Sequence, residues 1–358
     1  MNEAAIVPAE AARDVERFRT HSVGAGAFQV DEVAEGTRVR LVRNENYFIP
    51  GLPHLDELVY RLDLRSFRDV ADAFLRDEID VAHGVPLNMI GEIQKNEQLA
   101  PYLLQTVQLH SSYFTYDCSS PPFDRLEVRQ AIAHAVDRDR INEQVFSGLS
   151  VVAKSLLPPG LLGYDPALRG TPHDPERARA LLRQAGHGGG FKVDYRTWDT
   201  DEFNNSGVLG LIIEDLAAVG IEVQVTKHSA VDARQPLQTR GHGMVFCGNW
   251  YADFPDPDNF FYVFFHGDTS SLRGIYFHRA EIDADIVEAR RSNDVDRRVA
   301  IYRDLDQMVV REAPILPLFH ERLFVLHKPH VRGVRTSLVP PPVRYTDVWV
   351  ERAAVDSD

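Results

Sequence analysis

The sequence predicts an α/β protein with two lobes around a cleft, and three observations support this prediction. Residues 191–225 read as strand, helix and strand, the unit in which a crossover helix joins two parallel strands. Segments that alternate apolar and polar residues recur between segments with helical spacing. The chain has 358 residues, which is too long for one small core.

Local signals place the elements in the first third of the chain. Alternating runs at 26–30 and 37–42 flank a turn at 35–36 and predict a hairpin. Ser66, with Asp69 three residues later, predicts the start of a helix. The other elements expected here are a strand at 55–62, a buried strand at 79–82, a helix at 87–94 and an extended run at 103–116.

Helix boundaries are clearest further along. Asp174 as N-cap, Pro175 in the first turn and Gly186 as a stop predict a helix over 177–185. Residues 293–294 predict a break in the long helical stretch at 281–312. The remaining expected elements are helices at 127–146 and 206–219, and strands at 191–198, 221–225, 244–246 and 316–326.

Composition restricts the partners. Apolar content of 44% and charged content of 26% are typical of a soluble globular protein. The 39 basic and 53 acidic residues give a net charge of −14, which argues against a nucleic-acid or anionic-membrane partner. No stretch is as long and apolar as a membrane-spanning helix needs to be, so no membrane insertion is predicted.

Residues 1–18 lack a basic start followed by an apolar run, so no signal peptide is predicted in this chain. We therefore expect either a cytoplasmic chain or a piece whose targeting segment lies elsewhere. Cys118 and Cys247 are far apart in sequence, which excludes a CxxC motif and a zinc ribbon. Two unpaired thiols are expected in preference to a disulfide.

The most informative stretch, residues 249–261, gathers three aspartates, two prolines and five aromatic side chains, and we call it the aromatic-aspartate segment. Aromatic rings give rigid apolar walls, and a carboxylate among them can bind a cationic group. The segment follows the buried strand at 244–246, and ligand clefts in α/β sheets open at that end of a strand. The structural alternative is a loop whose aromatic rings fill the core and whose aspartates cap the next turn.

Motifs for other chemistry are weak. The alternating aspartates of the segment suggest calcium, but Pro255 and Pro257 interrupt them and the glycine and glutamate of a calcium loop are missing. The glycine turn at 24–28 lacks the third glycine and the lysine of a phosphate loop. The sequence has no HExxH motif and no G-x-S-x-G elbow. We predict no catalytic residue, no metal and no cofactor.

Seven sets of short motifs occur in order between residues 22 and 349. They are VGAGAF at 23–28 with LVRN at 41–44 and Tyr47; PFD at 122–124 with VRQAI at 128–132; Ala135 with DR at 137–138; DPERA at 174–178 with LL at 181–182 and AG at 185–186; VGI at 219–221; residues 250–260; and PILPL at 314–318. In this order they resemble the bacterial extracellular solute-binding proteins of family 5, the dipeptide, oligopeptide and nickel type.

The resemblance implies a type II periplasmic-binding-protein-like fold, with two lobes of mixed sheets flanked by helices. Lobe one would comprise residues 1–110 and 328–358, and lobe two residues 111–327. Lobe one is expected to be incomplete, because relatives carry a signal or lipoprotein segment, a first strand and a small subdomain before the turn at Gly24. The implied function is non-enzymatic: the protein captures a peptide or a small cationic or zwitterionic solute and delivers it to an ABC transporter permease.

The resemblance also implies site residues. Asp253 would neutralise the α-ammonium group of the ligand, while Trp250, Asn249 and Tyr251 supply a wall and hydrogen bonds. Asp117 stands where relatives often carry asparagine, and its extra negative charge is expected to alter the polarity preference for the ligand. Asp256 and Asp258 are expected to shape and cap the turn.

The implied location is periplasmic or extracellular in the parent protein. An alternative is the ligand-sensing module of a transcriptional or signalling regulator, which would be cytoplasmic. A hydrolase that uses clustered carboxylates is a third and less favoured hypothesis.

Overall fold

The computed structural model describes residue 13 and residues 24–85, 87–198, 207–228, 241 and 243–351. The chain divides into two compact units, of which unit 1 comprises Met1–Thr106 with Leu323–Asp358 and unit 2 comprises Val107–Arg322. The chain therefore passes from one unit to the other twice, after Thr106 and after Arg322. Each unit has its own sheets.

Unit 1 holds two three-stranded sheets, in the orders β1-β2-β3 and β4-β12-β5, and a two-stranded pair of β13 and β14. Ser66 caps helix α3 with the predicted capping box, and the hairpin of β1 and β2 is confirmed. The elements are β1 (Phe28–Ala34), β2 (Arg38–Arg43), β3 (Glu57–Arg61), α3 (Phe67–Leu75), β4 (Val81–His83), α4 (Leu87–Lys95), η1 (Ala100–Tyr102), β5 (Leu103–Val107), β12 (Arg322–His327), β13 (Val331–Arg332), η5 (Tyr345–Asp347) and β14 (Trp349–Val350).

Unit 2 is built on a six-stranded mixed sheet in the order β7-β11-β6-β10-β8-β9. The strands are β6 (His110–Tyr116), β7 (Val151–Val152), β8 (Phe191–Trp198), β9 (Ile221–His228), β10 (Met244–Tyr251) and β11 (Ile315–His320). Strands β8, β9 and β10 pair in parallel, whereas β6 pairs antiparallel with both β10 and β11. The predicted strand, helix and strand unit at 191–225 is confirmed as β8, α9 and β9.

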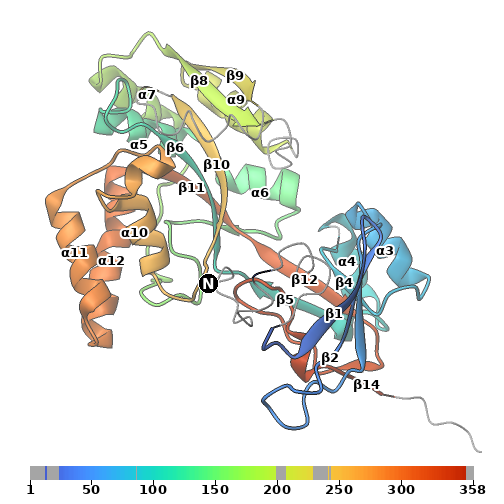
Figure 1. Ribbon diagram of the computed structural model, residues 1–358. Helices are drawn as coiled ribbons and strands as arrows, with labels where there is room; N and C mark the ends of the chain where they lie inside the picture. Colours follow the sequence, from blue (N-terminus) through green and yellow to red (C-terminus); the bar gives the residue numbers. More distant parts are fainter. Residues whose placement is uncertain are drawn as a thin grey trace, which may run out of the picture. The chain divides into compact units, whose positions relative to one another are not determined.

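The helices of unit 2 are α5 (Leu126–Ala135), α6 (Arg138–Phe146), α7 (Pro175–Gln184), α9 (Val208–Ala218), α10 (Asp258–Phe265), α11 (Ala280–Arg291) and α12 (Val295–Glu312), with a short η4 (Ser270–Arg273). Helices α10, α11 and α12 lie together beside the strands β6, β10 and β11 (Figure 1). Helices α5, α7 and α9 contribute apolar side chains to one core with β6, β8 and β11. Asp174 caps α7, and the predicted break between α11 and α12 is confirmed.

Three predicted runs have the expected type of secondary structure, but each one is divided into two elements. The expected helix at 127–146 is two helices, since the backbone of Val136 is extended and the Asp137 side chain accepts a hydrogen bond from the Arg140 amide at 2.9 Å, which starts a new helix. The extended run at 103–116 is β5 and β6, and the strand at 316–326 is β11 and β12. Both strand divisions lie where the chain passes between the units.

The parallel start of β8 beside β9 depends on Gly190, whose φ is +80°. A Cβ atom there would overlap the carbonyl oxygen of Gly220, which accepts the Phe191 amide at 3.1 Å. We expect Gly190→Ala to lower the free energy of unfolding by about 2 kcal/mol, because both the positive φ and the close approach penalise a side chain. Urea denaturation measures this change.

The control for this variant is Gly210→Ala, on the exposed face of α9, where a Cβ would meet nothing within 4 Å. It is expected to raise the free energy of unfolding by about 0.5–1 kcal/mol, because alanine favours helix. Equal effects from the two variants would contradict this account of Gly190.

Candidate ligand-binding site

The aromatic-aspartate segment begins within strand β10, not after it. Asn249, Trp250 and Tyr251 pair with Ser112, Ser111 and His110 of β6. Because successive side chains of a strand point to opposite faces, Asn249 and Tyr251 lie on one face of the sheet and Trp250 on the other. The structure therefore divides the predicted site residues into two groups.

On the face that carries Trp250, this residue and Asp253 are brought together by Asn259 of helix α10. The buried amide oxygen Oδ1 of Asn259 accepts the Trp250 Nε1–H at 3.2 Å and the Asp253 backbone amide at 3.0 Å. Its Nδ2 donates to Oδ2 of Asp253 at 3.3 Å. Asp253 itself is exposed, so its carboxylate is oriented by the protein and open to solvent.

The ring of Trp250 is held from two directions. Phe264 meets it edge-on with ring centroids 5.8 Å apart, and the guanidinium of Arg273 lies 4.3 Å from its centroid. A cation over an indole face contributes about 0.5–2 kcal/mol. The tryptophan therefore forms a fixed, half-exposed wall beside Asp253.

On the other face, Tyr251 packs on His110, with ring centroids 4.5 Å apart, and its hydroxyl donates a hydrogen bond to Oε2 of Glu321. Glu321 is the single residue between β11 and β12. Its backbone amide donates to Nδ1 of His110 at 3.0 Å, which places the imidazole proton on Nε2. Asn249 lies beside the same imidazole.

Burial determines the charges in this cluster. It lowers the pKa of His110 to about 3, against an opposing effect of Asn249, and lowers the pKa of His320 to about 4. Both imidazoles are therefore neutral at physiological pH. Burial also raises the pKa of Glu321, although the Tyr251 hydroxyl opposes the shift. Burial and the neighbouring Glu321 together raise the pKa of Tyr251.

The other two aspartates of the segment have the structural role that the sequence predicts. Asp256 accepts the Asp258 amide at 2.9 Å through Oδ1 and forms an ion pair with Arg298 at 2.7 Å. Asp258 begins helix α10 and lies 3.4 Å from the Arg290 guanidinium. The segment also supplies the core, since Phe260 and Phe261 are fully buried. Within one segment, Trp250 thus forms the candidate ligand wall while Phe260 and Phe261 belong to the core.

Asp117 lies away from this group. It follows the end of β6 that pairs with Met244, whereas Tyr251 pairs with the opposite end. Its buried carboxylate accepts hydrogen bonds from the amide and hydroxyl of Ser119, the hydroxyl of Ser120 and the amide of Gly241, at 2.6–2.9 Å. Burial acts to raise the pKa of Asp117, but these hydrogen bonds outweigh it and lower the pKa. A ligand contact at Asp117 stays a prediction.

Cys118 carries a free, half-buried thiol, and burial raises its pKa to about 12. Such a thiol is a poor nucleophile. The side chain of Cys247, the other cysteine of the chain, lies outside the described residues.

Comparison with known proteins decides the family. A family model described as "Bacterial extracellular solute-binding proteins, family 5 Middle" matches residues 1–271. The chain belongs to this family.

Relatives of this family 5 protein carry the names of several binding proteins. This chain is 27% identical to the dipeptide-binding protein of Escherichia coli K12, over 89% of this chain and 59% of that protein. It is 29% identical to di/tripeptide-binding protein 2 of Pseudomonas aeruginosa, over 90% and 60% of the two chains. A heme-binding protein A of Haemophilus influenzae is 27% identical over 89% and 58%. The family 5 chain thus spans about three fifths of the length of these relatives.

Solved structures give the same fold. The ABC transporter-associated periplasmic binding protein DppA from Helicobacter pylori, in complex with the peptide STSA, matches with a TM-score of 0.81 and 25% identity, over 97% of this chain and 68% of that one. NikA from Brucella suis, in complex with Fe(III)-EDTA, matches with a TM-score of 0.79 and 22% identity, over 92% and 68%. The predicted α/β fold of type II periplasmic binding proteins is confirmed.

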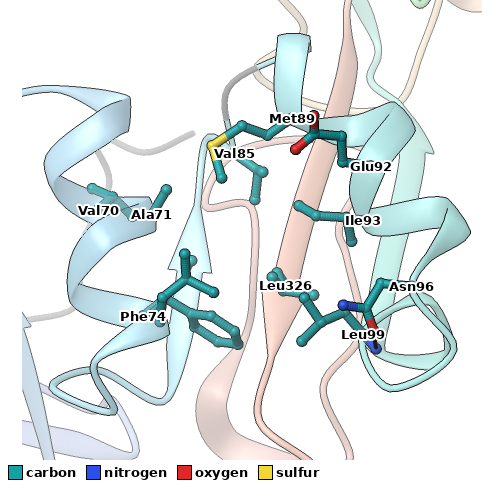
Figure 2. A pocket seen from close by; sticks show the side chains of 12 residues that line it. Val70, Ala71, Phe74, Val85, Met89, Glu92, Ile93, Asn96, Leu99 and Leu326 are labelled. Carbon is teal, nitrogen blue, oxygen red and sulfur yellow. Dashed lines mark hydrogen bonds between the residues drawn. The ribbon is translucent and has the colours of Figure 1, made fainter.

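The described hollows of the family 5 chain lie elsewhere. A cavity of about 160 Å³ in unit 1 lies between α3, α4 and β12, and Figure 2 shows Phe74, Ile93 and Leu326 facing it. A more open groove of about 410 Å³, also in unit 1, is lined by residues that include Tyr60, His83 and Tyr345. Neither hollow contains a predicted site residue, and the first is nearly all apolar. We therefore place the candidate site at β10 on geometry and chemistry, not on cavity volume.

Within the part of the chain that the structure describes, no helix is long and apolar enough to cross a membrane. The same residues hold no group of three His, Cys, Asp or Glu side chains that could bind a metal ion.

Sequence reasoning missed Asn259, His110 and Glu321. Asn259 is in the segment itself, six residues after Asp253, and its position in the first turn of a helix is the signal that could have indicated it. His110 and Glu321 join the site through strand pairing over 211 residues of sequence, for which one sequence offers no signal.

Proposed function

We propose that this chain captures a peptide, or another small solute with a free ammonium group, outside the cytoplasm for an ABC importer, and that it catalyses no reaction. The observation that carries the proposal is the arrangement of Trp250, Asn259 and Asp253. An exposed carboxylate, oriented by a buried amide and adjoining an immobilised indole, suits an ammonium group attached to an apolar body.

The relatives support this choice of ligand. Two are named for dipeptides or tripeptides, and the Helicobacter pylori structure holds a tetrapeptide and is described as ABC transporter-associated. These names favour an importer component over the sensing module of a regulator. Heme, glutathione and Fe(III)-EDTA are also named among the relatives, so a binding panel must include them.

In this proposal Asp253 is the anchor and Trp250 the wall, while Asn249 is an exposed hydrogen-bonding side chain on the opposite face of β10. Tyr251 shares that face with Asn249, and its hydroxyl is already bonded to Glu321. Asp117 is bonded on both carboxylate oxygens by the loop around it, and its contact with a ligand stays a prediction separate from this group.

Calorimetry with di- to pentapeptides, each with a free or an acetylated N-terminus, tests the proposal. We expect acetylation to weaken binding to the wild type at least tenfold, which corresponds to about 1.4 kcal/mol. Asp253→Asn is expected to weaken binding of the free peptide by the same factor and to bind both forms alike, because the charge pair is then already lost.

Asp268→Asn is the matched control. It removes one exposed carboxylate from the loop after α10 and is expected to leave both affinities within twofold of the wild type. Tight binding of heme, glutathione or Fe(III)-EDTA without any peptide binding would contradict the peptide assignment. Peptide binding that is indifferent to acetylation would contradict the role of Asp253.

A further inference from the structure

The chain passes between the units at two places that are hydrogen-bonded to each other within unit 2. One passage enters unit 2 at Val107, and the other leaves it at Arg322. The Gln108 amide donates to the carbonyl of Glu321 at 3.0 Å, and the Glu321 amide donates to Nδ1 of His110 at 3.0 Å. Residues 108–110 and Glu321 therefore form a reciprocal pair of contacts, one through backbone and one through a side chain.

The end of strand β10 is hydrogen-bonded to both passages, near Leu109 and at Glu321. The amide of Ala252, directly before Asp253, donates to the carbonyl of Leu109 at 2.8 Å. The hydroxyl of Tyr251 donates to Oε2 of Glu321. Adjacent residues of the aromatic-aspartate segment thus bind one passage through backbone and the other through a side chain.

The side chains that join β10 to the passages are buried or half-buried, so their hydrogen bonds contribute to stability. His110 is 3% exposed and Gln108 is 5% exposed, while Tyr251 and Glu321 are half-buried. A hydrogen bond to a carboxylate is worth about 1.5–3 kcal/mol, and leaving a buried partner unbonded costs about 1–3 kcal/mol. Tyr251 is also fixed by its ring contact with His110, so its hydroxyl can hold Glu321 with little loss of side-chain entropy.

We propose that Glu321 is a positioning residue, which through Tyr251 fixes the end of β10, and with it Trp250 and Asp253, to the two passages between the units. Glu321 lies on the face of the sheet opposite to Trp250 and acts through Tyr251. The proposal rests on the proposed function in one respect, namely that the segment it positions binds ligand. The mechanical link between the strand and the passages stands on the hydrogen bonds alone.

The link predicts a coupling in both directions. A change in the backbone of the passages would shift Tyr251 and Ala252, and a ligand that holds the end of β10 would hold the passages. Coupling between sites is reciprocal in free energy. The variants that break the link are Tyr251→Phe, which removes only the hydroxyl, and Glu321→Ala. Glu321→Gln keeps an oxygen that can accept the Tyr251 hydroxyl.

Amide hydrogen exchange of the ligand-free protein is the first measurement. We expect Tyr251→Phe and Glu321→Ala to accelerate exchange at Gln108, Glu321 and Ala252 at least fivefold, since these amides share one network. Glu321→Gln is expected to stay within twofold of the wild type, and Tyr251→Phe with Glu321→Ala to be no faster than the faster single variant. Tyr262→Phe, on helix α10, is the matched control and should change none of the three amides.

Peptide binding is the second measurement, and it separates this inference from the proposed function. If the wild type binds a peptide, Tyr251→Phe and Glu321→Ala should each weaken peptide binding at least threefold. Glu321→Gln should bind the peptide with the affinity of the wild type. If the wild type binds none, the proposed function fails, and the exchange data still decide whether Glu321 positions the strand. Exchange at Gln108 and Ala252 that is unchanged in Tyr251→Phe, or that is equally fast in Glu321→Gln and Glu321→Ala, would overturn the inference.

Discussion

Replacing Arg138 by alanine is expected to lower the free energy of unfolding by about 3–5 kcal/mol, the largest loss that we expect from a single substitution here. Arg138 is the first residue of helix α6 and is 8% exposed. Its Nη1 donates to the carbonyls of Ala153 at 3.0 Å and Pro317 at 3.3 Å, and its Nη2 donates to the carbonyl of Thr171. Burial lowers the pKa of this guanidinium.

The loss arises because three carbonyls, from three segments of unit 2, lose their donor at once. Each buried acceptor left without a partner costs about 1–3 kcal/mol, and the truncated side chain also leaves a void. Denaturation in guanidinium chloride measures the change. Arg138→Lys should fall between the wild type and alanine, because an ammonium group cannot reproduce the planar fork.

Arg291→Ala, at the exposed end of helix α11, is the control and is expected to change the free energy of unfolding by no more than about 0.5 kcal/mol. A loss below about 1 kcal/mol in Arg138→Ala would show that water replaces the guanidinium at these carbonyls.

The role of Arg138 illustrates what the sequence could not reveal. Its acceptors lie 15, 33 and 179 residues away, so no local pattern points to them. Signals that act within one turn were predictable: Ser66 with Asp69 and Asp174 with Pro175 start their helices as expected. The parallel pairing of β8 and β9 was predictable too, because a short crossover helix leaves few alternatives.

Where local signals were misread, the cause is also physical. Helical spacing continues through Val136, yet the Asp137 side chain caps the next helix, so one periodic stretch became two helices. Apolar alternation likewise continues through both passages between the units, and periodicity alone does not show where a strand leaves one sheet and enters another.

The candidate site was predictable as a segment but not as an arrangement. Composition identified residues 249–261, whereas the pairing of β10 with β6 shows that Trp250 and Tyr251 belong to the strand and so face opposite sides. The four donors around Asp117 were not predictable either, because they include the amide of Gly241, which is 124 residues distant.

A buried carboxylate gives the second large effect, and the size of this effect depends on pH. Asp306 of helix α12 is 2% exposed, and its Oδ1 accepts the amides of Leu156 and Leu157, each at 3.2 Å. Burial raises the pKa of Asp306 to about 6, although these hydrogen bonds oppose the shift. We expect Asp306→Asn to raise the free energy of unfolding by up to about 3 kcal/mol at pH 8, since about two pKa units correspond to about 3 kcal/mol.

The sign follows from proton binding. The folded state holds the Asp306 proton more tightly than the unfolded state, so the wild type is most favoured below about pH 4 and loses stability as pH rises to about 6. Asparagine keeps the acceptor oxygen and carries no charge, so its advantage should be constant above about pH 6 and should vanish below about pH 4. Urea denaturation at pH 4, 6 and 8 measures this, with Asp304→Asn on the exposed face of the same helix as control. If wild type and Asp306→Asn change in parallel from pH 4 to 8, the carboxylate is not desolvated in the folded protein, and the two amides then stabilise its charged form as well as water does.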